Sequence, residues 1–264
     1  MKISVCGKGG SGKSTTVALL ANEAAAQGYR VLVVDSDESN AGLFRLLGFE
    51  RPPAPLMDIV GGKKKIISTL RDPGPAESER KGTVLTQERI ALEDIPEENV
   101  VRRDNLMLVS VGKIMRALEG CACPFGVLSR EFLKRLHEGE RDLVLVDMEA
   151  GVEHFGRGVE ESVDAVLIVV EPSFESIELA GRIAALATSV GIRHVWAVLS
   201  KVPSEATASK VEAGLSERSV GVIGRVHHDS ELPDSGLEGG ALRGGESVNE
   251  IREVFHSLLR ALGG

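Results

Sequence analysis

One short segment, Gly7-Lys-Gly-Gly-Ser-Gly-Lys-Ser14, constrains the fold of this chain more than any other. It fits the pattern G-x-x-x-x-G-K-[ST], in which backbone N–H groups surround phosphate oxygens. An apolar run, Ile3–Cys6, precedes the segment, and an Ala- and Leu-rich stretch, Lys13–Gln27, follows it and ends at Gly28. Because glycine commonly follows the last residue of a helix, the chain is predicted to begin with a strand–loop–helix unit.

The rest of the chain repeats this alternation of strands and helices. Six further apolar runs are continuous rather than alternating in polarity, which is typical of parallel strands buried on both faces: Val31–Val34, Leu106–Val109, Leu143–Val146, Ala165–Val170, Val195–Leu199 and Val220–Ile223. Helices are predicted at Ser129–His137, Glu175–Val190, Glu205–Leu215 and Val248–Leu262. The pattern predicts an α/β fold with a single doubly wound, mostly parallel sheet flanked by helices.

Residues 1–264 are predicted to form one domain that carries a surface insertion at about residues 51–105. The stretch Arg51–Asn105 is rich in Pro, Gly and charged residues, with Asp72-Pro-Gly-Pro75 in its middle. We expect it to form hairpins and loops. Within it, Gly61-Gly-Lys-Lys-Lys65 is expected to be a solvated turn.

Composition disfavours two classes of partner. The net charge of −8, from 31 basic and 39 acidic residues, argues against a nucleic-acid partner. One Trp, one Tyr and seven Phe are also too few for base-stacking surfaces. No apolar run approaches the roughly 18 residues of a membrane-spanning helix, and no signal segment precedes the first strand. We therefore expect a cytoplasmic protein with no membrane partner.

The loop and three aspartates are the candidate nucleotide site. Lys13 is expected to reach the β- and γ-phosphates, and the Ser14 hydroxyl to hold Mg²⁺. Asp35 and Asp37 follow the second predicted strand, and Asp147 follows Leu143–Val146, where parallel strands deliver residues to a nucleotide crevice. Asp147 is expected to contact Mg²⁺ directly or through water. The alternative for these carboxylates is helix capping or turn chemistry. The other loop residues expected to bind the nucleotide are Gly7, Lys8, Gly9, Gly10, Ser11, Gly12 and Thr15.

A pair of cysteines, Cys121 and Cys123, is the candidate metal site. Gly120 and Pro124 flank the pair and disfavour a helix, so an extended backbone could place both sulfurs toward one point. Thiolates are soft ligands for Zn²⁺, Ni²⁺ or an iron–sulfur cluster, and two of them fill half of a tetrahedral site. A two-fold axis would supply the rest, which predicts a homodimer. The alternative is an incidental cysteine pair. Cys6, in the first strand, is expected to be a small buried residue.

With the additional Lys8, the loop reads Lys-Gly-Gly-x-Gly-Lys-[ST] and resembles the deviant Walker A class, which includes septum-site and partition ATPases and the nitrogenase iron protein. The resemblance implies that Lys8 crosses a two-fold interface to the partner subunit's nucleotide, although a solvated lysine is the alternative. It also implies that Asp37 positions the attacking water and that Asp35 lies near Mg²⁺. Ser200-Lys201 stands where members usually have an Asn-Lys pair facing adenine, so base selectivity is in doubt and ATP is favoured over GTP.

The loop, the Cys-Ala-Cys pair and the string Asp147-Met-Glu-Ala-Gly-Val-Glu-His-Phe-Gly-Arg-Gly158 together resemble the CooC family. These are the maturation ATPases that assist nickel insertion into carbon monoxide dehydrogenase and acetyl-CoA synthase. The resemblance implies a P-loop ATPase that converts ATP and water to ADP and phosphate with Mg²⁺. It further implies a homodimer that binds Ni²⁺ or Zn²⁺ through Cys121 and Cys123 of both subunits, with carbon monoxide dehydrogenase as the client. Glu149-Ala-Gly151 then corresponds to switch II.

Two alternatives remain open. One is an electron-transfer ATPase similar to the nitrogenase iron protein, with a [4Fe–4S] cluster between the subunits, although its cysteines normally lie far apart in sequence. The other is a MinD-like positioning ATPase without a metal. Such proteins carry a basic amphipathic C-terminal helix, whereas the C-terminal stretch here is not strongly basic and is expected to pack onto the sheet.

Overall fold

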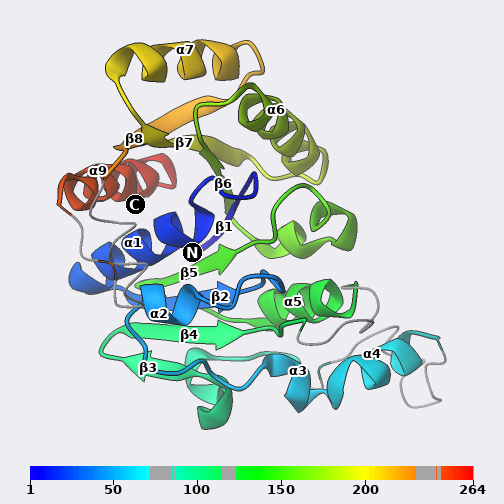
Figure 1. Cartoon of the computed structure of the whole chain (residues 1–264). Helices are drawn as coiled ribbons and strands as arrows, with labels where there is room; N and C mark the ends of the chain where they lie inside the picture. Colours follow the sequence, from blue (N-terminus) through cyan, green and yellow to red (C-terminus); the bar gives the residue numbers. More distant parts are fainter. Residues whose placement is uncertain (72–84, 86, 115–122, 230–241, 243–244, 264) are drawn as a thin grey trace.

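A computed structural model of the chain shows a single open sheet of parallel strands with one antiparallel edge (Figure 1). The structure describes residues 1–71, 85, 87–114, 123–229, 242 and 245–263. In this part of the chain eight strands follow the order β3-β4-β2-β5-β1-β6-β7-β8. All neighbours are parallel except β3 and β4. The strands are β1 (Lys2–Gly7), β2 (Arg30–Asp35), β3 (Val101–Arg103), β4 (Leu106–Ser110), β5 (Asp142–Asp147), β6 (Ala165–Val170), β7 (His194–Val202) and β8 (Gly221–His227).

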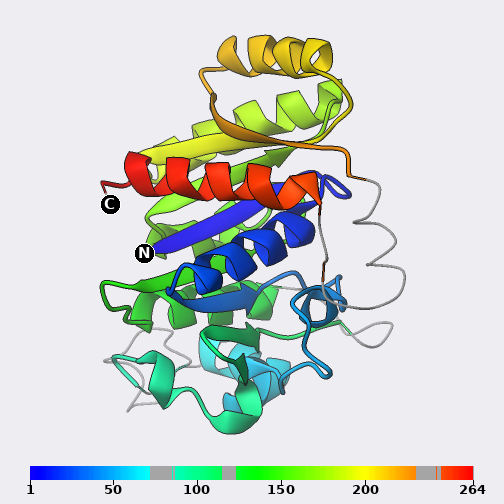
Figure 2. The ribbon, with the colours of Figure 1, turned by 90° about the vertical axis from the view of Figure 1, so that its left-hand side faces the viewer.

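Helices cover both faces of the sheet, as predicted for a doubly wound fold. They are α1 (Lys13–Ala26), α2 (Leu43–Leu46), α3 (Leu56–Ile59), α4 (Gly62–Arg71), α5 (Cys123–Arg135), α6 (Phe174–Ser189), α7 (Glu205–Ser216) and α9 (Glu246–Ala261). Figure 2 shows α1 and α9 side by side on one face. The other face carries α5, α6 and α7, whose apolar residues join a second core cluster.

The continuous apolar strands follow directly from these two layers. In β2, Val31 and Val33 belong to the cluster beneath α1, whereas Leu32 and Val34 belong to the cluster beneath α5. Alternate side chains point to opposite faces of a strand, so a strand with helices on both sides needs an apolar residue at every position.

The prediction for the insertion was wrong in part. Gly61-Gly-Lys-Lys-Lys65 is not a solvated turn, because α4 begins at Gly62 and continues through the lysines. Burial of Ile66, which is 1% exposed, explains the helix, since packing overrides a polar local composition. The expected hairpin does occur at the end of the insertion, where β3 pairs with β4. Asp72-Pro-Gly-Pro75 lies outside the described residues.

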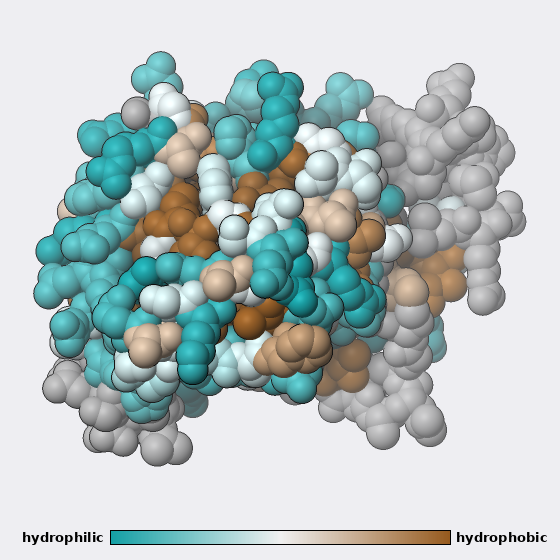
Figure 3. Space-filling view, turned by 90° about the horizontal axis from the view of Figure 1, so that it is seen from above, coloured by the Kyte–Doolittle hydropathy of each residue, from teal (hydrophilic) through white to brown (hydrophobic). Residues whose placement is uncertain are grey.

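The last helix packs onto the sheet, as expected. In α9 the buried side chains Ile251, Val254, Phe255 and Leu258 join the core cluster that includes α1. No helix among the described residues combines the length and the apolar character that crossing a bilayer requires. On the face that Figure 3 shows, hydrophilic side chains predominate and apolar ones appear mainly in hollows between them.

Candidate functional site

The phosphate loop joins β1, a central strand, to the N-terminus of α1. Gly10 and Gly12 have φ values of 78° and 97°, which favour glycine, and Gly12 directly precedes the helix. At Gly7 an added Cβ would lie 2.5 Å from the carbonyl oxygen of Val169 in β6. The conformation and close packing of the loop therefore require glycine at these positions. The loop lies next to the first turn of α1, whose backbone N–H groups have no partner within the helix and can bind phosphate oxygens.

The predicted phosphate lysine is buried in this loop. Lys13 is 7% exposed, and its Nζ donates to the carbonyl oxygen of Lys8 at 3.3 Å. Its ammonium group thus lies against the concave backbone of the loop, where a phosphate group would meet it.

Two strand ends bring carboxylates to this loop. Asp35 and Asp147 are the last residues of β2 and β5 and are paired in register. The Ser14 hydroxyl donates to Asp147 Oδ2 at 2.7 Å, and Asn40 Nδ2 donates to Ser14 Oγ at 2.9 Å. The structure therefore brings Ser14, Asp35 and Asp147 together as predicted, and it adds Asn40, which no motif indicated.

The donor set fits Mg²⁺. The other carboxylate oxygen of Asp147, Oδ1, is buried and has no hydrogen-bond partner within the described part of the chain. Mg²⁺ prefers oxygen ligands, and in phosphoryl-transfer sites it is held by a few protein oxygens together with the phosphates. The Ser14 hydroxyl and the Asp147 carboxylate supply such oxygens.

The pKa values of Asp147 and Asp35 are both raised, as expected for buried carboxylates. Burial, together with the charge of Asp35, raises the pKa of Asp147 to about 7. The hydrogen bond from Ser14 and the charge of Lys13 act in the opposite direction and lower this pKa. Burial also raises the pKa of Asp35 to about 6, against the charge and hydrogen bond of Lys113. A divalent cation would favour the ionised form of both carboxylates.

Asp37 is held in a turn just beyond β2. It is 6% exposed, and its Oδ1 accepts hydrogen bonds from Ser39 N at 2.9 Å, Ser39 Oγ at 2.6 Å and Asn40 N at 3.3 Å. This is the turn chemistry that the sequence left open. Its role in positioning the attacking water stays a prediction.

Lys8 makes an ion pair within its own chain. Its Nζ lies 2.9 Å from Oε1 of Glu171, the residue that follows β6, and the side chain is 38% exposed. The hydrogen bond and the charge of Glu171 raise the pKa of Lys8. The predicted contact of Lys8 with a partner's nucleotide stays a prediction.

Ser200 and Lys201 lie inside β7, which extends beyond the predicted end at Leu199. The Ser200 hydroxyl donates to Ser11 O and Lys201 Nζ donates to Gly10 O, both at 2.6 Å. Both residues therefore hold the backbone of the phosphate loop.

The same two side chains border a cavity of ≈ 240 Å³ beside the start of α1. Its apolar wall comes from Leu19, Leu46, Val226 and Leu242, and its polar edge includes His227, His228 and Asp229. An apolar slot with a few polar groups, next to a phosphate loop, suits a nucleotide base.

The predicted switch II segment touches the phosphate loop directly. The Gly151 N–H donates to Gly7 O at 3.2 Å, and Gly151 has a φ of 96°. The ring of the buried His154 lies 3.1 Å from Gly151 O through Nε2. Displacement of this segment would therefore act on the loop.

The prediction for the cysteine pair was wrong in one respect. Pro124 does not prevent a helix, because α5 begins at Cys123 and proline is tolerated in a first turn. Cys121 lies outside the described residues, and Cys123 is disulfide-bonded. No group of three or more His, Cys, Asp or Glu side chains that could hold a metal occurs among the residues described. Cys6 is fully buried in β1, as expected.

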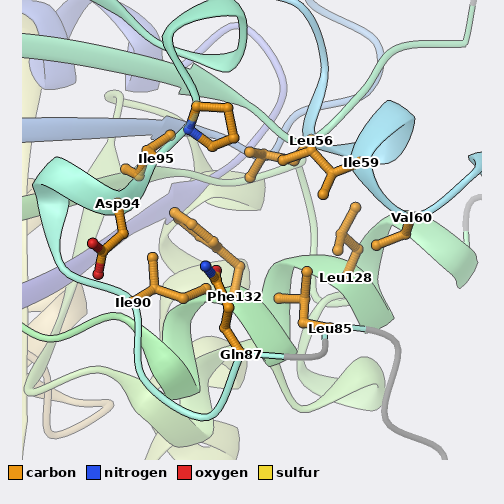
Figure 4. A pocket seen from close by; sticks show the side chains of 11 residues that line it. Leu56, Ile59, Val60, Leu85, Gln87, Ile90, Asp94, Ile95, Leu128 and Phe132 are labelled. Atoms are coloured by element: carbon orange, nitrogen blue, oxygen red, sulfur yellow. The ribbon is translucent and has the colours of Figure 1, made fainter.

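A second cavity, of ≈ 250 Å³, lies between the insertion and α5 (Figure 4). Aliphatic side chains of α3 face Leu128 and Phe132 of α5 across it, and Asp94 lies at its edge. It lacks a phosphate loop and a cluster of buried carboxylates.

Comparison with known proteins shows the family to which the chain belongs. The profile of the CobQ/CobB/MinD/ParA nucleotide binding domain family matches residues 3–242. An uncharacterised ATP-binding protein of Methanocaldococcus jannaschii is 38% identical over 98% of this chain and 100% of that protein. The carbon monoxide dehydrogenase accessory protein CooC of Rhodospirillum rubrum is 34% identical over 99% of this chain and 96% of that protein.

Solved structures show the same fold. The septum site-determining protein MinD of Pyrococcus horikoshii, complexed with Mg-ADP, has a TM-score of 0.70 at 15% identity and covers 99% of this chain and 97% of that chain. MinD of Aquifex aeolicus has a TM-score of 0.68 at 22% identity and covers 98% and 96%.

Proposed function

Because the chain belongs to the CobQ/CobB/MinD/ParA family of nucleotide-binding domains, we propose that it is an accessory ATPase for the maturation of carbon monoxide dehydrogenase. The chain is an ATPase that converts ATP and water to ADP and phosphate. In the proposal, two copies associate when ATP binds and carry one Ni²⁺ or Zn²⁺ between them in the cytoplasm, without a membrane or nucleic-acid partner. The 34% identity with CooC over nearly the whole of both chains supports this client.

The geometry of the phosphate loop supports the ATPase half of the proposal. Backbone N–H groups of the loop and the ammonium group of Lys13 bind the phosphates. Ser14 and Asp147 would hold Mg²⁺, and the ion would supply positive charge against the charge that develops on the phosphate oxygens. Asp37, two residues beyond the end of β2, positions the attacking water. Its Oδ1 accepts a hydrogen bond from the N–H of Asn40, whose side chain donates to Ser14.

Dimer formation requires Lys8 to change partners. Lys8 pairs with Glu171 in the single chain and is more than one-third exposed, so the exchange needs no unfolding. In the dimer its ammonium group stabilises charge on the partner's nucleotide, in the manner of an arginine finger.

The cargo half depends on Cys121 and Cys123. The cargo ion is bound by thiolates, so this step requires the reduced form of Cys123, which is disulfide-bonded here. Four thiolates from two chains complete a tetrahedral site. Separation of the chains after hydrolysis removes half of the ligands and releases the ion to the client.

Two observations together support the proposal. The chain has a complete phosphate loop with Ser14 and Asp147 beside it as oxygen ligands for Mg²⁺, and its sequence is similar to CooC over nearly its whole length. The test is metal analysis and sizing of the reduced protein, with and without ATP. Wild type is expected to bind about one metal ion per two chains, as four thiolates per ion require. Cys121→Ala/Cys123→Ala should bind none and retain ATPase activity.

Cys6→Ala is the matched control, because Cys6 is buried in β1, and it should keep full metal content. Retention of the metal by the double variant, or a wild type that stays monomeric with ATP and metal, would contradict the proposal. A brown protein after anaerobic purification would instead indicate an iron–sulfur cluster. Activation of carbon monoxide dehydrogenase in cells that produce each variant tests the client.

A further inference from the structure

The segment that begins with the last residue of β2, Asp35–Glu38, is hydrogen-bonded to the stretch that follows β4. We call this segment switch I. The Val111 N–H donates to Asp35 O at 2.9 Å, and the Ile114 N–H donates to Glu38 O at 3.1 Å. These bonds join two stretches that are far apart in sequence and fix their relative position at the edge of the nucleotide site.

Lys113 connects the same two stretches through its side chain. Its Nζ donates to Asp35 Oδ1 at 2.6 Å and also to the carbonyl oxygen of Asp37. The side chain is 16% exposed, so these bonds are shielded from water. One ammonium group therefore binds both a buried carboxylate of the site and the backbone of switch I.

The residue before Lys113 contacts the first turn of α5. A Cβ at Gly112 would lie 2.5 Å from Cε1 of Phe125, so the Phe125 ring packs directly on the Gly112 backbone. Phe125 is 3% exposed and lies two residues after Cys123, where α5 begins. In Figure 1 the arrows of β2 and β4 point toward α5.

A second bond joins switch I to α5 itself. The Ser36 hydroxyl donates to the Ser129 hydroxyl at 3.0 Å, and both side chains are buried. Switch I is thus tied to α5 both directly and through the stretch that contains Lys113.

We propose that Lys113 is a positioning residue that couples the nucleotide state of the phosphate site to the first turn of α5, and thereby to Cys123. This inference rests on the proposed function, because the metal site it regulates is the one proposed above. A shift of Asp35 or of the Asp37 carbonyl group on nucleotide binding would also shift the Lys113 ammonium group, which donates to both. Because interiors are close-packed and the Phe125 ring packs on the Gly112 backbone, such a shift would displace this ring.

The experiment measures this coupling with Zn²⁺ as the probe. The Kd of the full reduced chain for Zn²⁺ is determined by competition with a chromophoric chelator, with and without Mg²⁺ and a non-hydrolysable ATP analogue. The wild-type ratio of the two Kd values is expected to lie at about 5–150, the usual range for coupled sites. In Lys113→Met the ratio should fall to about one, the value for uncoupled sites, while the analogue still binds.

Three further variants sharpen the result. Lys113→Arg keeps a cation with several donors and should recover most of the ratio. Ser129→Ala removes only the direct bond to switch I and should give an intermediate ratio. Lys63→Met is the matched control, because the Lys63 ammonium lies 4.3 Å from the centroid of the Phe125 ring, and it should keep the wild-type ratio.

A wild-type ratio in Lys113→Met overturns the inference. If wild type binds no Zn²⁺, the proposed metal site fails, and hydrogen exchange then decides the inference separately. In Cys121→Ala/Cys123→Ala, the analogue should change the exchange of the amides of Phe125–Ser129, and Lys113→Met added to this variant should abolish the change. Persistence of the change with Lys113→Met also overturns the inference.

Discussion

Replacing Asp147 by Asn is expected to stabilise the nucleotide-free protein at pH 8 while abolishing Mg²⁺-dependent hydrolysis. Asp147 is fully buried, and burial together with the charge of Asp35 raises its pKa from 3.8 to about 7. One pKa unit corresponds to about 1.4 kcal/mol, so ionising this group in the folded protein costs about 4 kcal/mol at pH 8. An amide of the same size carries no such cost.

The sign follows from proton linkage. Between about pH 4 and pH 7 the folded protein retains a proton on Asp147 that the unfolded chain has released. The free energy of unfolding therefore decreases as the pH rises through this window. Asn does not titrate, so the advantage of Asp147→Asn should be about 4 kcal/mol at pH 8 and less than half of that at pH 5.

The assay is urea unfolding followed by circular dichroism, in EDTA and without nucleotide, at pH 5 and pH 8. Asp142→Asn is the matched control at the other end of β5. Burial acts to raise the pKa of Asp142, but hydrogen bonds from Arg30 and the Gly139 N–H hold it below its ordinary value. The control should therefore lose stability at pH 8, by about 1.5–3 kcal/mol for a charged hydrogen bond.

The reasoning fails if Asp147→Asn is less stable than wild type at pH 8, or if its advantage is the same at both pH values. Added Mg²⁺ and ATP should narrow the difference, because the cation stabilises the ionised carboxylate in wild type alone.

Three further substitutions test other parts of the site. Lys8→Ala should keep nucleotide binding but lower kcat by about 10³–10⁵-fold, as loss of an arginine finger does, and sizing should show no ATP-dependent dimer; normal turnover would exclude a role in trans. Gly7→Ala should lower the free energy of unfolding, measured in thermal melts, by about 1–3 kcal/mol. Its Cβ would lie 2.5 Å from Val169 O, and the backbone φ of 144° is unfavourable for alanine. Ser200→Ala removes the bond to Ser11 O and should raise KM for ATP about fivefold, the effect of about 1 kcal/mol; an unchanged KM would show that this bond does not shape the loop.

The sequence predicted the features that local patterns encode. Buried parallel strands need apolar residues at every position, so runs such as Val31–Val34 identified the sheet. The spacing of the phosphate loop identified Lys13 and Ser14, and the ends of two strands identified Asp35 and Asp147.

The sequence did not predict contacts that only the assembled sheet creates. Lys113 and Asp35 are 78 residues apart, and Lys8 and Glu171 are 163 apart, so neither pair has a local signal. The start of α5 was missed because Pro124 was interpreted as a helix breaker. Proline is tolerated in the first turn of a helix, because the N–H group that it lacks would have no partner within the helix there.

The two edges of the sheet restrict how copies of this protein can associate. At one edge β3 has only three residues, of which Arg102 and Arg103 are exposed. At the other edge β8 follows β7 with register shifts after Ala197 and Leu199. Short, charged and irregular edges resist the addition of a foreign strand. Fibrous aggregation through the backbone is therefore suppressed, and side chains must govern any pairing of copies.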